Sequence, residues 1–182
     1  IPLTVRNARR LPWKKQDKHT HRSDILITEG SRDIVNEAFR VLRSNIDFMS
    51  SGEAGHNVFV LTSFNPGSGK SFIAMSLATS FAITGKRVLV IDGDLRHGST
   101  SSYVSNPKHG LIDYLSGQQS DVKSLVAPVK SYPSLHVLPI GKVPPNPTEL
   151  LENGRLADVL SALRSSYDYI FIDCPPIDIV AD

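Results

Sequence analysis

One short stretch decides the fold: TSFNPGSGKS, residues 62–71. An apolar run typical of a strand precedes it at residues 58–61, and a helix-like apolar run follows it at residues 72–82. Small residues in this setting let consecutive backbone N–H groups turn inward around an anion, and the helix N-terminus adds its partial positive charge. The stretch is therefore predicted to be a phosphate-binding loop that connects a strand to a helix.

Particular side chains of this loop suit a nucleotide with its metal ion. Lys70 is expected to reach the terminal phosphates, and the Ser71 hydroxyl is expected to ligate Mg²⁺. The loop departs from the pattern G-x-x-x-x-G-K-[ST] at its first position, where Phe64 replaces glycine. As a variant, it needs support from the rest of the chain. The residues predicted to contact the nucleotide are Asn65, Pro66, Gly67, Ser68, Gly69, Lys70, Ser71, Phe72 and, farther along the chain, Arg96.

That support comes from two apolar stretches that end in carboxylates, RVLVIDGDLR at residues 87–96 and YIFIDCPP at residues 169–176. Each is typical of a buried strand. In an open parallel sheet the ligand crevice lies at the carboxyl ends of the strands. Asp92, Asp94 and Asp173 are therefore predicted to face the same phosphates as the loop. Three carboxylates there suit a divalent cation together with a proton-accepting role.

Strand-like and helix-like segments alternate along the chain, which predicts an α/β fold: a P-loop NTPase with a mainly parallel sheet and helices on both faces. Asp33 is placed to cap the first helix, whose apolar residues recur every three or four positions and are expected on one face. The expected helices lie at about 34–49, 72–82, 110–115, 122–126, from 148 onward, and 155–164. The expected strands end near residues 61, 92, 138 and 173.

Composition and charge divide the chain in two. Of 182 residues, 40% are apolar and 21% are charged, which is ordinary for a globular domain, and the single cysteine excludes a disulfide framework. Residues 1–22 carry seven Lys or Arg against one acidic residue, whereas the remainder is net acidic. We expect a basic juxtamembrane-type linker at 1–31 and a P-loop domain at 32–182. No apolar run is long enough to span a membrane.

The basic segment has two open interpretations. It either lies on anionic lipid beside a membrane span outside this sequence, or it is a solvated linker without a partner. Nucleic acid is not expected, because no helical spacing presents the charges to a groove and only Trp13 is there to stack on a base.

Glu37, Arg40 and Arg43 recur every three residues on one face of the first predicted helix. Such a stripe is either a solvated surface with local ion pairs or a set of bidentate contacts to a neighbouring subunit. The spacing alone favours the solvated surface.

Five motifs in order resemble those of the bacterial tyrosine kinases that control capsular and exopolysaccharide chain length. This family's P-loop is related to that of the partitioning ATPases. The resemblance covers residues 32–182. The motifs are E-x-x-R-x-x-R at 37–43, the loop at 63–71, DGDLR at 92–96, VPPNPTELL at 143–151 and DCPP at 173–176.

The resemblance implies an ATP- and Mg²⁺-dependent protein-tyrosine kinase that autophosphorylates between subunits and regulates capsular or exopolysaccharide polymerisation and export. It implies a place at the cytoplasmic face of the bacterial inner membrane. The implied partners are further copies of the chain in a ring, a membrane-spanning chain-length regulator in the same polypeptide upstream, and a phosphotyrosine phosphatase. It also favours the interface interpretation of Glu37, Arg40 and Arg43.

The resemblance and the local chemistry give the same catalytic roles. Lys70 would neutralise charge on the transferring group. Ser71, Asp94 and Asp173 would hold the metal ion. Asp92 is assigned to accept the proton of an incoming tyrosine hydroxyl, although the division of roles between Asp92 and Asp94 stays open. Arg96 would pair with phosphate or with one of these carboxylates, unless it is an ordinary surface arginine.

One departure from the family concerns length. The family's domain continues past the Asp173 strand into further strands and a tyrosine cluster, so we expect a domain truncated at its C-terminus and a natural protein that is longer at both ends. Two other functions remain, a partitioning-type positioning ATPase and a nucleotide-dependent docking module without phosphoryl transfer. Asn65 favours the kinase, because positioning ATPases carry a lysine there that reaches the partner's phosphates.

Overall fold

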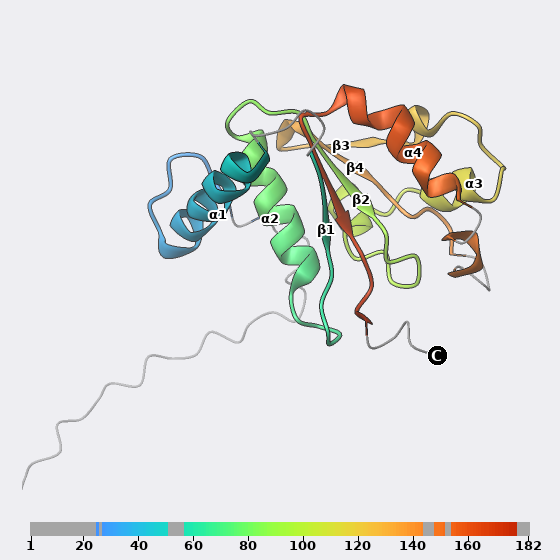
Figure 1. Cartoon of the computed structure of the whole chain (residues 1–182), viewed down its shortest axis with the longest axis horizontal. Coiled ribbons are helices and arrows are strands. Elements are labelled where there is room, and N and C mark those ends of the chain that lie inside the picture. The colour runs from blue at the N-terminus through green and yellow to red at the C-terminus, as the bar shows by residue number, and fades with distance from the viewer. Residues whose placement is uncertain (1–24, 26, 51–56, 144–147, 152–153, 178–182) are drawn as a thin grey trace, which may run out of the picture.

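The computed structural model describes residues 25, 27–50, 57–143, 148–151 and 154–177. Within them, five strands form one sheet in the order β1-β5-β2-β4-β3 (Figure 1). The first four in this order run parallel, and β3 pairs antiparallel with β4. The strands are β1 (Val58–Leu61), β2 (Val88–Asp92), β3 (Ala127–Val129), β4 (Tyr132–Leu138) and β5 (Tyr169–Asp173).

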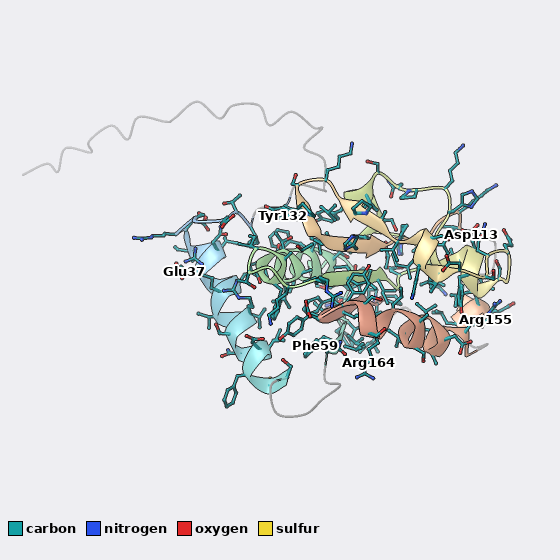
Figure 2. The ribbon with its side chains drawn as sticks, turned by 90° about the horizontal axis from the view of Figure 1, so that it is seen from above. Glu37, Phe59, Asp113, Tyr132, Arg155 and Arg164 are labelled. Atoms are coloured by element: carbon teal, nitrogen blue, oxygen red, sulfur yellow. The ribbon has the colours of Figure 1, made fainter. Side chains whose placement is uncertain are left out.

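Helices cover both faces of this sheet (Figure 1). One face carries α1 (Ile34–Ser50) and α2 (Lys70–Ala82), and the other carries α3 (Leu111–Leu115) and α4 (Arg155–Leu163). Successive residues of β2 enter opposite cores, because side chains alternate across a strand: Val88 and Val90 pack on the α2 side, whereas Leu89 and Ile91 pack with α3 and α4. Figure 2 shows side chains filling both layers.

The two central strands explain why the carboxyl ends of the sheet come together. Every residue of β2 and of β5 is buried, as expected for parallel strands covered on both faces. The strands pair in register so that Asp92 lies opposite Asp173. The predicted convergence of these two strand ends is therefore observed.

Most of the predicted elements are present, and the differences concern short segments. The segments near 122 and 148 are 3₁₀ turns (Val122–Leu125 and Thr148–Leu151) instead of α-helices. The short strand β3 was not predicted, because Pro128 obscures its pattern; proline is tolerated there since β3 lies at the edge of the sheet. The Pro-rich loop at 144–147 lies outside the described residues.

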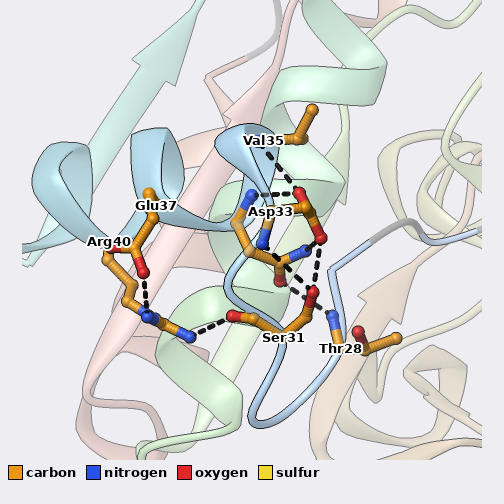
Figure 3. Close-up of polar contacts among 7 residues, drawn as sticks. Thr28, Ser31, Asp33, Val35, Glu37 and Arg40 are labelled. Carbon is orange, nitrogen blue, oxygen red and sulfur yellow. Dashed lines mark hydrogen bonds and ion pairs between the residues drawn. The ribbon is translucent and has the colours of Figure 1, made fainter.

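The N-terminus of α1 is capped as predicted (Figure 3). Asp33 Oδ1 accepts hydrogen bonds from the amides of Val35 at 2.9 Å and Asn36 at 3.0 Å. The hydroxyl of Ser31 also donates to Asp33, and this bond is the main reason that the pKa of Asp33 falls to about 2. Asn36 in turn accepts from the Thr28 amide at 3.0 Å, which fastens the preceding segment to the helix.

The apolar face predicted for α1 is only partly buried. Phe39 is buried against α2, but Ile34 is 89% exposed and Val41 is 60% exposed. The helix packs on α2 at the margin of the molecule. Only a narrow strip of its surface is therefore in contact with α2. An apolar strip remains on the outside of α1.

Two further expectations concern the N-terminal linker and membrane-spanning helices. The predicted linker at 1–31 lies mostly outside the described residues, but Ile27 is buried and its carbonyl accepts a hydrogen bond from the Tyr132 hydroxyl at 2.6 Å. In the part of the chain that the structure describes, every helix is too short or too polar to cross a bilayer.

Candidate functional site

The loop between β1 and α2 has the backbone of an anion cradle. Gly67 and Gly69 adopt positive φ angles of 70° and 89°, which side-chain-bearing residues rarely adopt. Gly69 precedes the first residue of α2, and its carbonyl accepts the amide of Ile73 at 2.9 Å. The amides of residues 70–72 therefore have no intrahelical acceptor and form the donor end of the helix. The predicted loop–helix junction is present, with these donors at its start.

The predicted acidic residues converge beside this junction. Asp92, Asp94 and Asp173 are 0%, 2% and 0% exposed. Lys70 Nζ lies 3.6 Å from Asp94 Oδ2, and the amide of Gly93 donates to the Asp173 carbonyl at 2.9 Å. The loop lysine and three carboxylates thus occupy one place at the carboxyl ends of β2 and β5.

Burial and mutual repulsion perturb these carboxylates. The pKa of Asp173 rises to about 6, chiefly through burial and further through the charges of Asp92 and Asp94, while Lys70 acts in the opposite direction. The Ser71 hydroxyl is close enough to the carboxylate to lower this pKa, although the pair does not meet the geometry of a hydrogen bond. Burial likewise raises the pKa of Asp92, against the hydrogen bonds from Ser101.

These residues fit a metal–nucleotide. Both carboxylate oxygens of Asp173 are buried without a hydrogen-bond partner among the described residues, and an uncompensated buried anion is costly. Mg²⁺ binds oxygen ligands and commonly takes only one or two protein carboxylates together with phosphate oxygens. In the described part of the chain, no three His, Cys, Asp or Glu residues are grouped so as to hold a metal ion by themselves. Ser71, Asp94 and Asp173 supply suitable oxygens.

Asp94 has a second basic neighbour that sequence reasoning missed. The ring Nδ1 of His97 lies 3.1 Å from Asp94 Oδ1, and the His97 amide donates to the same oxygen at 3.3 Å. The chain turns after β2, and this turn brings His97 against Asp94. The sequence does not show that the chain turns here. Arg96 is exposed on this turn, and its predicted contact with phosphate stays a prediction.

Ser101 is another unpredicted member of the site. Its amide and hydroxyl both donate to Asp92 Oδ2, at 2.7 and 2.6 Å. Nothing in the run STSS at residues 99–102 distinguishes this serine from its neighbours. Its contact arises because a 3₁₀ turn, Ser101–Val104, folds back on the end of β2.

The loop residues predicted to contact the nucleotide are on the surface. Residues 65–69 are exposed, and Lys70, Ser71 and Phe72 are half-buried. The Ser63 hydroxyl donates to the carbonyl of Asn65 at 2.9 Å and steadies the entry to the loop. Phe72 packs edge-to-face against Phe39, with ring centroids 6.2 Å apart, which joins the first turn of α2 to α1.

The Glu-Arg-Arg stripe of α1 makes contacts within the chain. Glu37 pairs with Arg40, whose guanidinium also donates to the Ser31 carbonyl (Figure 3). The side chains of Glu37 and Arg40 remain 51% and 38% exposed. Arg43 points inward and donates to the Ser80 carbonyl of α2 at 2.6 Å. Figure 2 shows Glu37 far from Arg155 and Asp113, on the α1 side of the molecule.

Comparison with known proteins places this geometry in a family. A family model described as AAA domain matches residues 56–180. Tyrosine-protein kinase wzc of Salmonella typhimurium is 37% identical over 166 residues, 91% of this chain and 23% of that protein. Tyrosine-protein kinase CpsD of Streptococcus agalactiae is 40% identical over 148 residues, 80% of this chain and 62% of that protein. The chain therefore spans less than two thirds of the length of either relative.

Solved structures give the same result. The kinase domain of Escherichia coli tyrosine kinase ETK superposes with a TM-score of 0.77 and 31% identity, over 85% of this chain and 60% of that chain. The septum site-determining protein MinD, complexed with Mg-ADP, from Pyrococcus horikoshii OT3 has a TM-score of 0.58 and 25% identity, over 66% of this chain and 49% of that chain. The predicted P-loop fold is thereby confirmed. The chain belongs to the AAA-domain family of P-loop proteins, and the relatives that it resembles within this family include bacterial tyrosine-protein kinases.

Proposed function

We propose that this chain is the nucleotide-binding domain of an ATP-dependent protein-tyrosine kinase. The observation that carries the proposal is the meeting of Lys70 with three buried carboxylates beside the donor end of α2. The names of the relatives support tyrosine as the acceptor. Because the chain spans only part of these relatives, the acceptor tyrosine and the whole protein's activity belong to the proposal.

Each site residue has a part in this proposal. Bound Mg-ATP supplies the transferable phosphoryl group and the cation that neutralises it. The loop amides and Lys70 hold the phosphates, with Arg96 as a further cation near them. Ser71, Asp94 and Asp173 hold the metal ion. Asp92 takes the proton of the incoming tyrosine hydroxyl, a role that its raised pKa supports.

Transfer between subunits requires self-association, for which α1 supplies a surface. Glu37 and Arg40 are partly exposed on this helix, beside the exposed apolar side chains of Ile34 and Val41. An exposed apolar strip flanked by charged groups is typical of a protein–protein interface. We assign Glu37, Arg40 and Arg43 to a ring-forming interface. Within it, Arg43 would hold α1 against α2 through its bond to the Ser80 carbonyl.

The cellular role follows from the family resemblance. The proposed kinase regulates polymerisation and export of a capsular polysaccharide or exopolysaccharide at the cytoplasmic face of the bacterial inner membrane. Its proposed partners are a membrane-spanning chain-length regulator in the same polypeptide, anionic lipid contacted by residues 1–22, and a phosphotyrosine phosphatase. Nucleic acid is not among them.

A positioning ATPase is the second candidate, favoured by the likeness to MinD. In such an enzyme water accepts the phosphoryl group. Asn65 weighs against it, because asparagine offers no cation to the phosphates of a facing subunit. A docking module that binds nucleotide without chemistry is the third candidate.

One experiment separates the three. The natural full-length protein is incubated with labelled ATP and Mg²⁺, and the label is mapped. Label on tyrosine supports the kinase, free phosphate alone supports the positioning ATPase, and bound but unreacted nucleotide supports the docking module. Lys70→Met should abolish tyrosine labelling; because it also removes the cation beside the buried Asp94, thermal stability should fall as well, and labelling is measured at a temperature at which the variant stays folded. Lys86→Met, which removes an exposed lysine after the far end of α2, serves as the matched control and should label normally.

A further inference from the structure

The turn that follows β2 carries a serine with an unusual number of ties to the site. The amide of Ser101 and its hydroxyl both donate to Asp92 Oδ2, at 2.7 and 2.6 Å. Ser101 is 2% exposed and Asp92 is 0% exposed, so water does not compete for these bonds. Hydrogen bonds to an ionised acceptor are among the stronger ones in proteins.

The third bond of Ser101 fixes the direction of its hydroxyl. The amide of Ile140 donates to Ser101 Oγ at 2.9 Å. Because a backbone N–H can only donate, Oγ is the acceptor in that bond, and its own proton is directed to Asp92 Oδ2. The hydroxyl therefore bridges the end of β2 to the segment just after β4 in a single orientation.

This arrangement makes the two oxygens of Asp92 different. Two donors engage Oδ2, whereas Oδ1 is buried without a hydrogen-bond partner among the described residues. The buried Thr100 hydroxyl is close enough to lower the pKa of Asp92 but does not meet the geometry of a hydrogen bond to it. A carboxylate oxygen with two donors has both in-plane lone pairs occupied. A proton or another ligand that reaches Asp92 is therefore bound at Oδ1.

We propose that Ser101 is a positioning residue of the phosphoryl-transfer site: it holds the Asp92 carboxylate in one orientation, with Oδ1 as the reactive oxygen. The inference rests on the proposed function, since it takes Asp92 as a participant in the reaction. Ser101 acts through Asp92, because its side chain is buried and its only hydroxyl proton is donated to Asp92.

The kinetic test is a double-mutant cycle in the full-length protein. Ser101→Ala should lower kcat for tyrosine phosphorylation by roughly 10- to 100-fold and leave the KM for ATP nearly unchanged. Ser101→Thr, which retains the hydroxyl, should recover most of the rate. In the Asp92→Asn background, Ser101→Ala should cause no further loss, because the group through which it acts is already disabled. Losses that multiply independently would overturn the proposal.

Ser102→Ala is the matched control. Its hydroxyl lies in the same turn but donates to the Ser99 carbonyl, at 2.8 Å. Removing it should leave kcat unchanged. If Ser102→Ala and Ser101→Ala lower kcat equally, the effect belongs to the turn as a whole and the proposal is wrong. Should Ser101→Ala fold poorly, the effect of Asp92→Asn on the Ser101 amide proton tests the same bridge.

A second readout needs neither nucleotide nor catalysis. In the nucleotide-free protein, Ser101→Ala should speed hydrogen exchange of the Ile140 amide, which loses its acceptor, and Asp92→Asn should shift the amide proton of Ser101. Unchanged exchange together with an unshifted proton would refute the bridge. A wild-type protein that labels no tyrosine but passes this test would refute the kinase proposal and leave the Ser101–Asp92 bridge intact.

Discussion

Asp92 and Asp173 lie side by side as a register pair at the ends of adjacent parallel strands, β2 and β5. Both are fully buried, and the charge of Asp92 raises the cost of ionising Asp173. Because the strand register places them together, the repulsion is built into the sheet. A bound cation relieves it, and in the absence of a cation the site opposes the stability of the fold.

Asp173→Asn should therefore stabilise the nucleotide-free protein at neutral pH. The pKa of Asp173 is raised from 3.8 to about 6 in the folded state. Protonation of this carboxyl therefore favours the folded state, fully so below pH 3.8, and this contribution to stability is lost as the pH rises through 6. The variant should match wild type near pH 4 and exceed it at pH 7.5 by up to about 3 kcal/mol.

Urea unfolding at these two pH values, with a chelator present, measures the difference. Asp158→Asn removes an exposed carboxylate of α4 and serves as the control, which should not become more stable at pH 7.5. If the stability of Asp173→Asn keeps the pH dependence of wild type, Asp173 is not the group that titrates.

The division of roles between the two carboxylates of β2 and its following turn can be tested by separate amide substitutions. Asp92→Asn should reduce kcat by about 10²- to 10⁴-fold with nucleotide affinity retained, as expected for loss of a proton acceptor. Asp94→Asn removes the charge beside Lys70 and His97, so it should weaken Mg-nucleotide binding by on the order of tenfold. Titration with a fluorescent nucleotide and a phosphorylation assay measure the two effects. If Asp94→Asn lowered kcat and Asp92→Asn weakened nucleotide binding, the roles of proton acceptor and metal ligand would have to be exchanged.

The parts of the site that could be predicted are those with local patterns. The sequence TSFNPGSGKS indicates a phosphate-binding loop by its residue types alone. Two buried strands that end in Asp place these carboxylates at the same edge of the sheet once the strands are parallel. Ser101 could not be found in this way, because its contact depends on how a 3₁₀ turn folds back on Asp92. Likewise, hydrophobic periodicity indicated that α1 has an apolar face, but it did not indicate that α2 covers only part of that face.

Arg43 illustrates the same limit, and its contact makes a prediction about stability. Sequence spacing groups it with Glu37 and Arg40, yet its guanidinium donates to the carbonyl of Ser80 in the last turn of α2, where cations are favourable. Arg43→Ala leaves that carbonyl without its partner and should lower the free energy of unfolding by about 1–2 kcal/mol. Urea unfolding of a dilute, monomeric sample checks this. No loss of stability would mean that the contact does not form in solution.

Arg40→Ala should act on assembly instead. Its ion pair with Glu37 is partly exposed, and such pairs contribute under about 1 kcal/mol to folding. Arg40 also donates to the Ser31 carbonyl, so the variant should lose up to about 1–2 kcal/mol of stability, while sedimentation velocity should show a smaller average mass than for wild type at the same concentration. An unchanged mass distribution would mean that this face of α1 is a solvated surface and not an interface.

Gly69→Ala addresses the anion cradle directly. Gly69 has φ +89°, and an added Cβ would meet no atom of the chain within 4 Å. The substitution therefore introduces backbone strain of roughly 1–2 kcal/mol without a steric clash inside the protein. To relieve this strain the loop must turn its amides away from the direction that faces the phosphates, so nucleotide affinity should fall as well as stability.

Gly85→Ala is the control for this change. Gly85 follows the opposite end of α2, has φ +83°, and is equally free of neighbours within 4 Å. Both variants should lose similar stability in thermal unfolding, because the strain is similar. Only Gly69→Ala should lose binding in a titration with fluorescent ATP, since only this glycine lies where residues 70–72 present their amides. Equal affinities in the two variants would show that the backbone at Gly69 does not hold the phosphates.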